Sequence, residues 1–205
     1  VIDSSFIGNV LCNNGATGYI QVFNGALSDS VTYSWSSGGA TQSITNLSAG
    51  TYQLIAEDTR VCIDTLEFVV AEPDNFFIDL EGNDVLCNGE SNGSILTSAS
   101  GGTAPYVIFL NNQIIEPLLL NQLPSGDYEI YGVDSHGCMS PTSQFTLDEP
   151  LGLSNTFTVT LASAINSFDG SIFSAVEGGT PPYSFIWEGQ QSTESTIVYL
   201  NPGWY

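Results

Sequence analysis

The chain has almost no positive charge. It contains one arginine, Arg60, one histidine, His136, and no lysine, against 22 Asp and Glu, and its formal net charge is −21. Nucleic acids and anionic lipid headgroups are bound by clustered Lys and Arg, which this sequence does not provide. We therefore exclude nucleic acid as a partner and expect no membrane binding by this segment.

Long apolar runs and helical periodicity are also missing. No stretch of about 20 apolar residues is present to cross a bilayer, and no segment places apolar residues at i, i+3, i+4 and i+7 over three turns. Short alternating segments lie between clusters of Gly, Asn, Pro and Ser, a pattern typical of strands and turns. The sequence predicts an all-β protein. It starts at Val1 without a basic and apolar leader, so we expect a piece of a longer or processed protein.

Groups that usually carry catalysis are scarce. Arg60 and His136 fall at the same position of two related turns, which favours solvated hairpin tips. Two carboxylate pairs could provide the acid and base of a glycosidase: Glu57 with Asp58, and Glu81 with Asp84. Both pairs fall on repeated strand ends and turns, and we expect neither to have a basic partner. We predict that the segment is not an enzyme.

Cofactor motifs are missing as well. The sequence contains no twelve-residue calcium loop of the form D-x-[DN]-x-[DN]-G-x₅-E, although its acidic surface could still collect Ca²⁺ weakly. The Gly-Gly pairs that begin at Gly101 and Gly178 are not followed by a helix, so they indicate turns and not phosphate-binding loops. We expect no dedicated cofactor or metal site.

A threefold internal repeat is the main feature present. "VLCNNGATGYI" from Val10 returns as "VLCNGESNGSI" from Val85 and more weakly as "ASAINSFDGSI" from Ala162. The segments "NLSAGTY", "QLPSGDY" and "YLNPGWY" follow at the same period, and "AEP" and "DEP" close the first two copies. We predict repeats at residues 1–73, 74–150 and 151–205, the third incomplete at its C-terminal end.

Each repeat is predicted to be an immunoglobulin-like β-sandwich of about 75 residues, because it offers six or seven short strands with regular turn signals. In the first repeat we expect strands at residues 19–23, 31–35, 52–57 and 66–70. The L-x-x-G-x-Y element resembles a tyrosine corner, in which the hydroxyl bonds to nearby backbone. The corner residues would be Tyr52, Tyr128 and Tyr205.

Aromatic residues divide into two groups. Core packing is favoured for pairs that alternate along a strand: Tyr33 with Trp35, and Phe185 with Trp187. Trp204 differs, because its counterparts Thr51 and Asp127 are polar. We expect Trp204 to point outward as a candidate surface contact.

The four cysteines follow the repeat. Cys12 and Cys62 lie in the first copy and Cys87 and Cys138 in the second, whereas the third copy has Ala164 at the first cysteine position. Of the three possible pairings, the one that repeats with the module joins Cys12 to Cys62 and Cys87 to Cys138. A Cys₄ zinc site would need closely spaced C-x₂₋₄-C pairs, which are not present. Disulfides would imply an oxidising compartment outside the cytoplasm.

Taken in order, the motifs C-N-G-x-S-N-G-S-I, G-G-T-x-P-Y, L-x-x-G-x-Y, D-x-x-G-C and E-P resemble the SprB repeat of the gliding-motility adhesins of Bacteroidetes. The second copy carries nearly the whole pattern, whereas the first lacks the Gly-Gly-Thr run and has Val61 in place of a glycine. The resemblance implies a long filamentous cell-surface adhesin exported by the type IX secretion system. It also implies candidate O-glycosylation in the "DSV" and "DTL" motifs, at Ser30 and Thr65.

Two functions remain open at this stage. The segment could act as a stalk or as a weak multivalent binder of external surfaces and polysaccharides, with the secretion and gliding machinery engaged by other parts of the parent chain. Alternatively, it could be a carbohydrate-binding or accessory module of a secreted enzyme.

Overall fold

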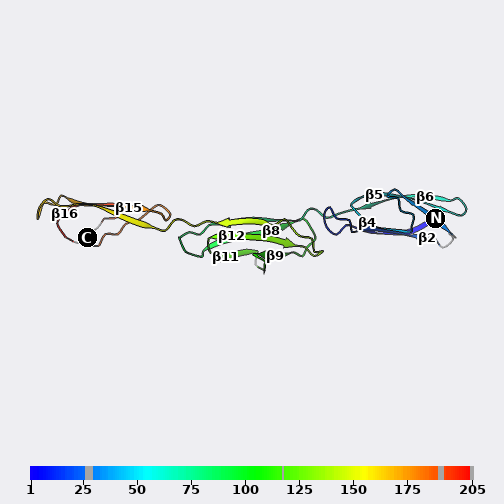
Figure 1. Cartoon of the computed structure of the whole chain (residues 1–205), viewed down its shortest axis with the longest axis horizontal. Coiled ribbons are helices and arrows are strands. Elements are labelled where there is room, and N and C mark those ends of the chain that lie inside the picture. Colours follow the sequence, from blue (N-terminus) through cyan, green and yellow to red (C-terminus); the bar gives the residue numbers. More distant parts are fainter. Residues whose placement is uncertain (26–29, 117, 189–191, 204–205) are drawn as a thin grey trace. The chain divides into compact units, whose positions relative to one another are not determined.

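The computed structural model describes residues 1–25, 30–116, 118–188 and 192–203. Within these ranges the chain forms sixteen β-strands in small antiparallel sheets and contains no helix, so the all-β prediction is confirmed. No helix is therefore available in this described part to cross a membrane. Figure 1 colours the strands by their position in the sequence, from blue at the N-terminal end to red at the C-terminal end.

Two three-stranded sheets form the N-terminal part. One has the order β1 (Ile2–Gly8), β2 (Gly18–Asn24), β4 (Ser43–Leu47). The other has the order β3 (Val31–Trp35), β5 (Gly50–Asp58), β6 (Ile63–Val70). The four strands expected from the sequence of the first repeat are confirmed as β2, β3, β5 and β6.

Both N-terminal sheets contribute to one hydrophobic core. Strand β2 buries Gly18, Ile20 and Val22 and exposes the residues between them, as period-two alternation requires. The rings of Trp35 and Phe68 lie 5.5 Å apart in this core. The buried members are Val10, Ile20, Val22, Trp35, Ile44, Leu47, Leu54, Ala56, Phe68 and Val70.

Two further sheets follow along the chain. One has the order β10 (Gln113–Ile115), β9 (Val107–Leu110), β12 (Gly126–Val133), β13 (Ser143–Leu147). The other has the order β11 (Leu119–Leu123), β8 (Gly93–Ser100), β7 (Phe77–Asn83). On β12 the alternation again buries Tyr128, Ile130 and Gly132.

The C-terminal sheet has the order β14 (Ser154–Thr160), β15 (Gly170–Glu177), β16 (Thr196–Leu200). All seven residues of β14 are exposed, whereas β15 and β16 bury Ser174, Ile197 and Leu200. Phe185 and Trp187, expected on a strand, lie outside the strands, and both are half-buried. The indole N–H of Trp187 donates to the carbonyl oxygen of Glu194 at 2.9 Å.

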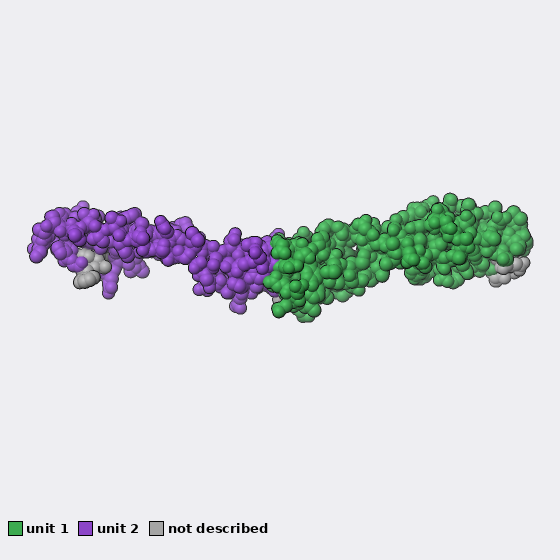
Figure 2. Space-filling model, in the orientation of Figure 1, with its two compact units in different colours: residues 1–80, 97–118, 129–144 green, residues 81–96, 119–128, 145–205 purple. Residues whose placement is uncertain are grey.

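The chain divides into two compact units, coloured in Figure 2. The first consists of residues 1–80, 97–118 and 129–144, and the second of residues 81–96, 119–128 and 145–205. Four strands, β7, β8, β12 and β13, have residues in both units. This division does not follow the repeat boundaries expected at residues 73 and 150, which stay predictions.

Candidate functional site

The cysteine loops are the most chemically distinctive part of the structure. Cys12 and Cys138 form a disulfide, with 2.01 Å between the sulfurs and 5.6 Å between the Cα atoms. Cys62 and Cys87 are free and exposed. The predicted pairing of Cys12 with Cys62 and of Cys87 with Cys138 is therefore wrong.

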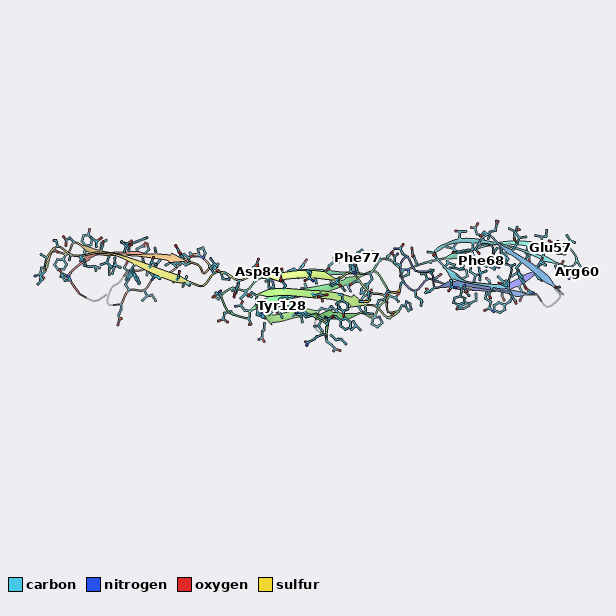
Figure 3. All side chains as sticks on the ribbon, in the orientation of Figure 1. Glu57, Arg60, Phe68, Phe77, Asp84 and Tyr128 are labelled. Atoms are coloured by element: carbon cyan, nitrogen blue, oxygen red, sulfur yellow. A yellow bond between two sulfur atoms is a disulfide. The ribbon has the colours of Figure 1, made fainter. Side chains whose placement is uncertain are left out.

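The length of β6 explains why Cys12 cannot reach Cys62. Cys62 directly precedes this strand, whereas the Cys12 loop is held at its other end, where the Val10 amide donates to the carbonyl oxygen of Ala71 at 2.9 Å. Eight residues of extended strand span about 23 Å. A disulfide requires Cα atoms within about 7 Å. Figure 3 shows Glu57 and Arg60 at the Cys62 end of the hairpin and Phe68 nearer the other end.

The loop that presents Cys12 belongs to a turn that occurs three times. Its closing bond runs from the Gly15 amide to the Cys12 carbonyl oxygen at 2.9 Å, and the same bond joins Glu90 to Cys87 and Ser167 to Ala164. The third residue of each turn has positive φ: Asn14 at 57°, Gly89 at 76° and Asn166 at 66°. Asn and Gly are the residues that tolerate this left-handed conformation best.

A glutamate near the end of each of the first two predicted repeats holds the loop in place. The Asn14 amide donates to Oε2 of Glu72 at 2.6 Å, and the Gly89 amide donates to Oε2 of Glu149 at 2.6 Å. These glutamates belong to the E-P pairs that the sequence analysis took only as boundary marks. Their repeated position was the signal that could have revealed this role.

The turns that carry Cys62 and Cys138 are organised by buried aspartates. Oδ1 of Asp58 accepts the amides of Arg60 and Cys62, and Oδ1 of Asp134 accepts those of His136 and Cys138, all at 2.8 to 2.9 Å. Asp58 is 6% exposed and Asp134 is 5% exposed. In the sequence, Asp134 stands in the D-x-x-G-C motif without an assigned role, and Asp58 was considered only as half of a carboxylate pair.

The electrostatics of these aspartates follow from the same bonds. The backbone N–H of Cys62 is the main cause that lowers the pKa of Asp58, with Arg60 adding to the effect. Burial acts to raise the pKa of Asp134, but the N–H groups of Cys138, Thr103 and His136 together lower it. Both groups therefore favour the ionised form that accepts these bonds.

Arg60 and His136 do lie at hairpin tips. Both side chains are exposed, and Nε of Arg60 lies 3.5 Å from Oδ2 of Asp58. In the second carboxylate pair, Glu81 and Asp84, Asp84 has a structural role, because its Oδ1 accepts the Asp148 amide at 3.0 Å. At the corresponding position of the predicted first repeat, Oδ1 of Asn9 accepts the Ala71 amide at 3.1 Å. These contacts orient backbone and bring no acid and base together.

Two of the expected corner tyrosines bond to nearby backbone. The Tyr52 hydroxyl donates to the Ser48 carbonyl oxygen at 2.9 Å, and the Tyr128 hydroxyl donates to the Pro124 carbonyl oxygen at 2.8 Å. Burial raises the pKa of Tyr128, which is labelled in Figure 3. Tyr205 and the candidate contact Trp204 lie outside the described residues.

The remaining candidates are divided between the surface and the core. Ser30 lies in a bend and Thr65 lies on β6, and both are exposed. Trp35 is buried, and the hydroxyl of half-buried Tyr33 donates to Oδ1 of Asn24 at 2.6 Å. In the described ranges no group of three or more His, Cys, Asp or Glu is arranged to hold a metal ion.

Comparison with known families identifies one part of the chain. Residues 82–113 match the family model of the SprB repeat, so the chain carries an SprB repeat at this position. The match covers β8, β9 and the loop of Cys87. No curated protein shows significant sequence similarity to the chain.

Proposed function

We propose, from the SprB repeat at residues 82–113, that this segment is a non-catalytic part of a long filamentous cell-surface adhesin. In this proposal the segment is a series of immunoglobulin-like repeats that acts as a stalk or as a weak multivalent binder of external polysaccharide. Type IX secretion would deliver the parent protein to the outside of the cell, and its gliding role would depend on machinery that contacts other regions of the parent.

The family match is the observation that carries this proposal. The Cys12–Cys138 disulfide supports an extracellular location, because such bonds persist in oxidising compartments. The acidic composition supports a surface that remains soluble and does not adhere to phosphate polymers. The contacts of the aspartates and glutamates described above are structural and support a role without catalysis.

Surface labelling tests the location. Antibodies raised against residues 1–205 should label intact cells that produce the parent protein, and a block of type IX export should abolish this labelling. Labelling that requires permeabilised cells would contradict the proposal. An antibody against a periplasmic protein of the same cells provides the control for membrane integrity.

Multivalent display tests the adhesive role. Beads that carry many copies of residues 1–205 should be retained on a polysaccharide gel, whereas the free segment should elute with little delay. Equal elution of both would leave only the stalk function. Tight binding of the free segment would instead favour a carbohydrate-binding module of a secreted enzyme.

A further inference from the structure

The free thiol of Cys87 sits in a loop built like that of the disulfide-bonded Cys12. Both loops close with an amide to a cysteine carbonyl oxygen, at 2.9 Å for Cys12 and 3.1 Å for Cys87. In both loops a backbone amide donates to the carboxylate of a glutamate in an E-P pair, at 2.6 Å. The backbones of the two loops therefore hold their cysteines in equivalent positions, although only Cys12 forms a disulfide.

The backbone that follows each E-P pair is also held in the same way. The Gly102 amide donates to the Asp74 carbonyl oxygen at 2.9 Å, and the Gly179 amide donates to that of Leu151 at 2.7 Å. Gly101 and Gly178 each approach this backbone so closely that a Cβ would lie within about 2.2 Å of a carbonyl oxygen. The surroundings of the Cys12 disulfide are thus reproduced next to Cys87, up to the point where the Cys138 turn would enter.

An apolar hollow marks that point. Beside Cys12, a hollow of about 270 Å³ is lined in part by Gly137, Cys138 and Met139. Beside Cys87 the hollow measures about 790 Å³, and among the described residues no turn of that kind lines it. Its lining includes Cys87 itself and the apolar side chains of Leu151, Leu153 and Phe157.

A comparison of Phe76 with Leu153 shows which kind of segment fits the hollow beside Cys87. Phe76 is 3% exposed, and a Cβ at Gly132 on β12 would lie 2.8 Å from its ring. Leu153 occupies the position that corresponds to Phe76 and is 68% exposed. Strand β12, which is followed by the turn of Cys138, covers Phe76. A strand and turn of the same kind would cover Leu153.

We propose that the cysteines of these repeats pair from each repeat to the next. We call the first cysteine of a repeat, Cys12 or Cys87, the loop cysteine, and the second, Cys62 or Cys138, the turn cysteine. Cys87 pairs with the turn cysteine of the repeat that follows it, as Cys12 pairs with Cys138. Cys62 is the turn cysteine that pairs with the loop cysteine of a preceding repeat. This inference rests on the division into repeats and is independent of what the surface binds.

The bond forms by thiol–disulfide exchange. Two thiols lose two protons and two electrons to an oxidising disulfide, which leaves as two thiols, and one sulfur–sulfur bond joins the repeats. Ala164 has no sulfur, so the corresponding loop of the third repeat cannot form such a bond. The pattern therefore specifies which joints are cross-linked and which is not.

A graft tests the proposal. The chain is extended after Tyr205 by a second copy of residues 129–150, which places a turn cysteine twelve residues after Gly203. The copy of Met139 is changed to leucine, so that the grafted peptide differs in mass from the native one. The protein is refolded with reduced and oxidised glutathione and digested, without reduction, by a glutamate-specific protease.

The digestion separates all four native cysteines. Cleavage after glutamate, which does not occur before proline, places them in the peptides 1–57, 58–67, 82–90 and 130–177. We expect peptide 82–90 linked to the graft, peptide 1–57 linked to 130–177, and the number of free thiols reduced from two to one. The same graft with serine at its turn cysteine should keep two. A link within one repeat, from Cys12 to Cys62 or from Cys87 to Cys138, would overturn the proposal.

A second measurement covers the case in which the graft does not fold. A synthetic peptide that copies residues 129–147, activated at its cysteine as a mixed disulfide with thionitrobenzoate, is added to the unmodified chain. We expect capture by Cys87 at least tenfold faster than capture by Cys62, and equal capture of both with a scrambled peptide. Equal rates with the native peptide would contradict the proposal.

Discussion

Cys12 and Cys138 are 126 residues apart in sequence, yet their Cα atoms lie 5.6 Å apart in a disulfide. The bond joins the loop after β1 to the turn after β12. It therefore cross-links the predicted first repeat to the predicted second and does not close either repeat on itself.

Removal of this disulfide should destabilise the first compact unit. Closure of a loop of 126 residues contributes about 5 kcal/mol in the chain-entropy treatment. We expect Cys12→Ser combined with Cys138→Ser to lower the free energy of unfolding by up to this amount in guanidinium titrations followed by circular dichroism. The matched variant, Cys62→Ser with Cys87→Ser, should change it by less than about 0.5 kcal/mol, as is usual for exposed positions. An equal loss in both variants would argue against the observed pairing.

Val61 provides a test of backbone strain. It has φ of 66° at the position where the second repeat has Gly137 with φ of 83°. A β-branched residue is disfavoured in the left-handed region by about 1 to 2 kcal/mol. Since Val61 is 70% exposed, Val61→Gly loses little packing and should raise the stability by about 1 kcal/mol in a urea titration. The reciprocal change, Gly137→Val, should lower it by a similar amount.

Asp134 should be important for the turn that carries Cys138. Its two oxygens accept the amides of Thr103, His136 and Cys138 at 2.8 to 2.9 Å. Asp134→Ala leaves these donors without their acceptor, at a cost of about 2 to 3 kcal/mol, measured as the change in unfolding free energy. Disulfide formation from the reduced protein should also slow. The control is His136→Ala, because the bond to Asp134 comes from the His136 backbone; an equal loss in this variant would contradict the role assigned to the carboxylate.

Asp169 predicts a local dependence of stability on pH. Hydrogen bonds from Ser167 and Ser163 lower its pKa from 3.8 to about 2 in the folded chain. Since the folded pKa is below the unfolded one, the stabilisation is complete above about pH 4 and is lost as the pH falls towards 2. Asp169→Asn should flatten the melting temperature between pH 4 and pH 2 relative to the parent.

Asn92 offers the reciprocal experiment. Its Oδ1 accepts the Leu86 amide at 2.8 Å, as Oδ1 of Asp169 accepts the Ser163 amide at 2.8 Å. Asn92→Asp should therefore introduce the acid-dependent loss into the second repeat. Identical melting profiles for the parent and both variants would contradict the assignment.

The alternation of apolar and polar residues predicted four strands of the first repeat, although it failed for Phe185 and Trp187. Ile20 and Val22 are buried and Tyr19 and Gln21 are exposed, as the period-two pattern requires. The Ser48 and Pro124 contacts of Tyr52 and Tyr128 could also be anticipated, because the L-x-x-G-x-Y element fixes both ends of the bond within five residues. These features depend on local sequence.

The disulfide partner could not be predicted in this way. In a periodic chain, the link from Cys12 to Cys62 and the link from Cys12 to Cys138 repeat with equal regularity. Only the length of β6, which separates the Cys12 loop from Cys62, distinguishes them. The buried aspartates were missed for a similar reason, because Asp134 becomes an acceptor of three amides only when Thr103 is brought next to its turn.

The same cross-link determines how the chain responds to pulling. Tension applied at the two ends enters the sulfur bridge at Cys12 and leaves it at Cys138, so the segment between them carries no load. Fully extended, that segment would add about 430 Å to the length of the chain. Because the bridge is covalent, unfolding of the enclosed strands under tension cannot release this length. The disulfide thus limits extensibility, a mechanical property that packing alone would not provide.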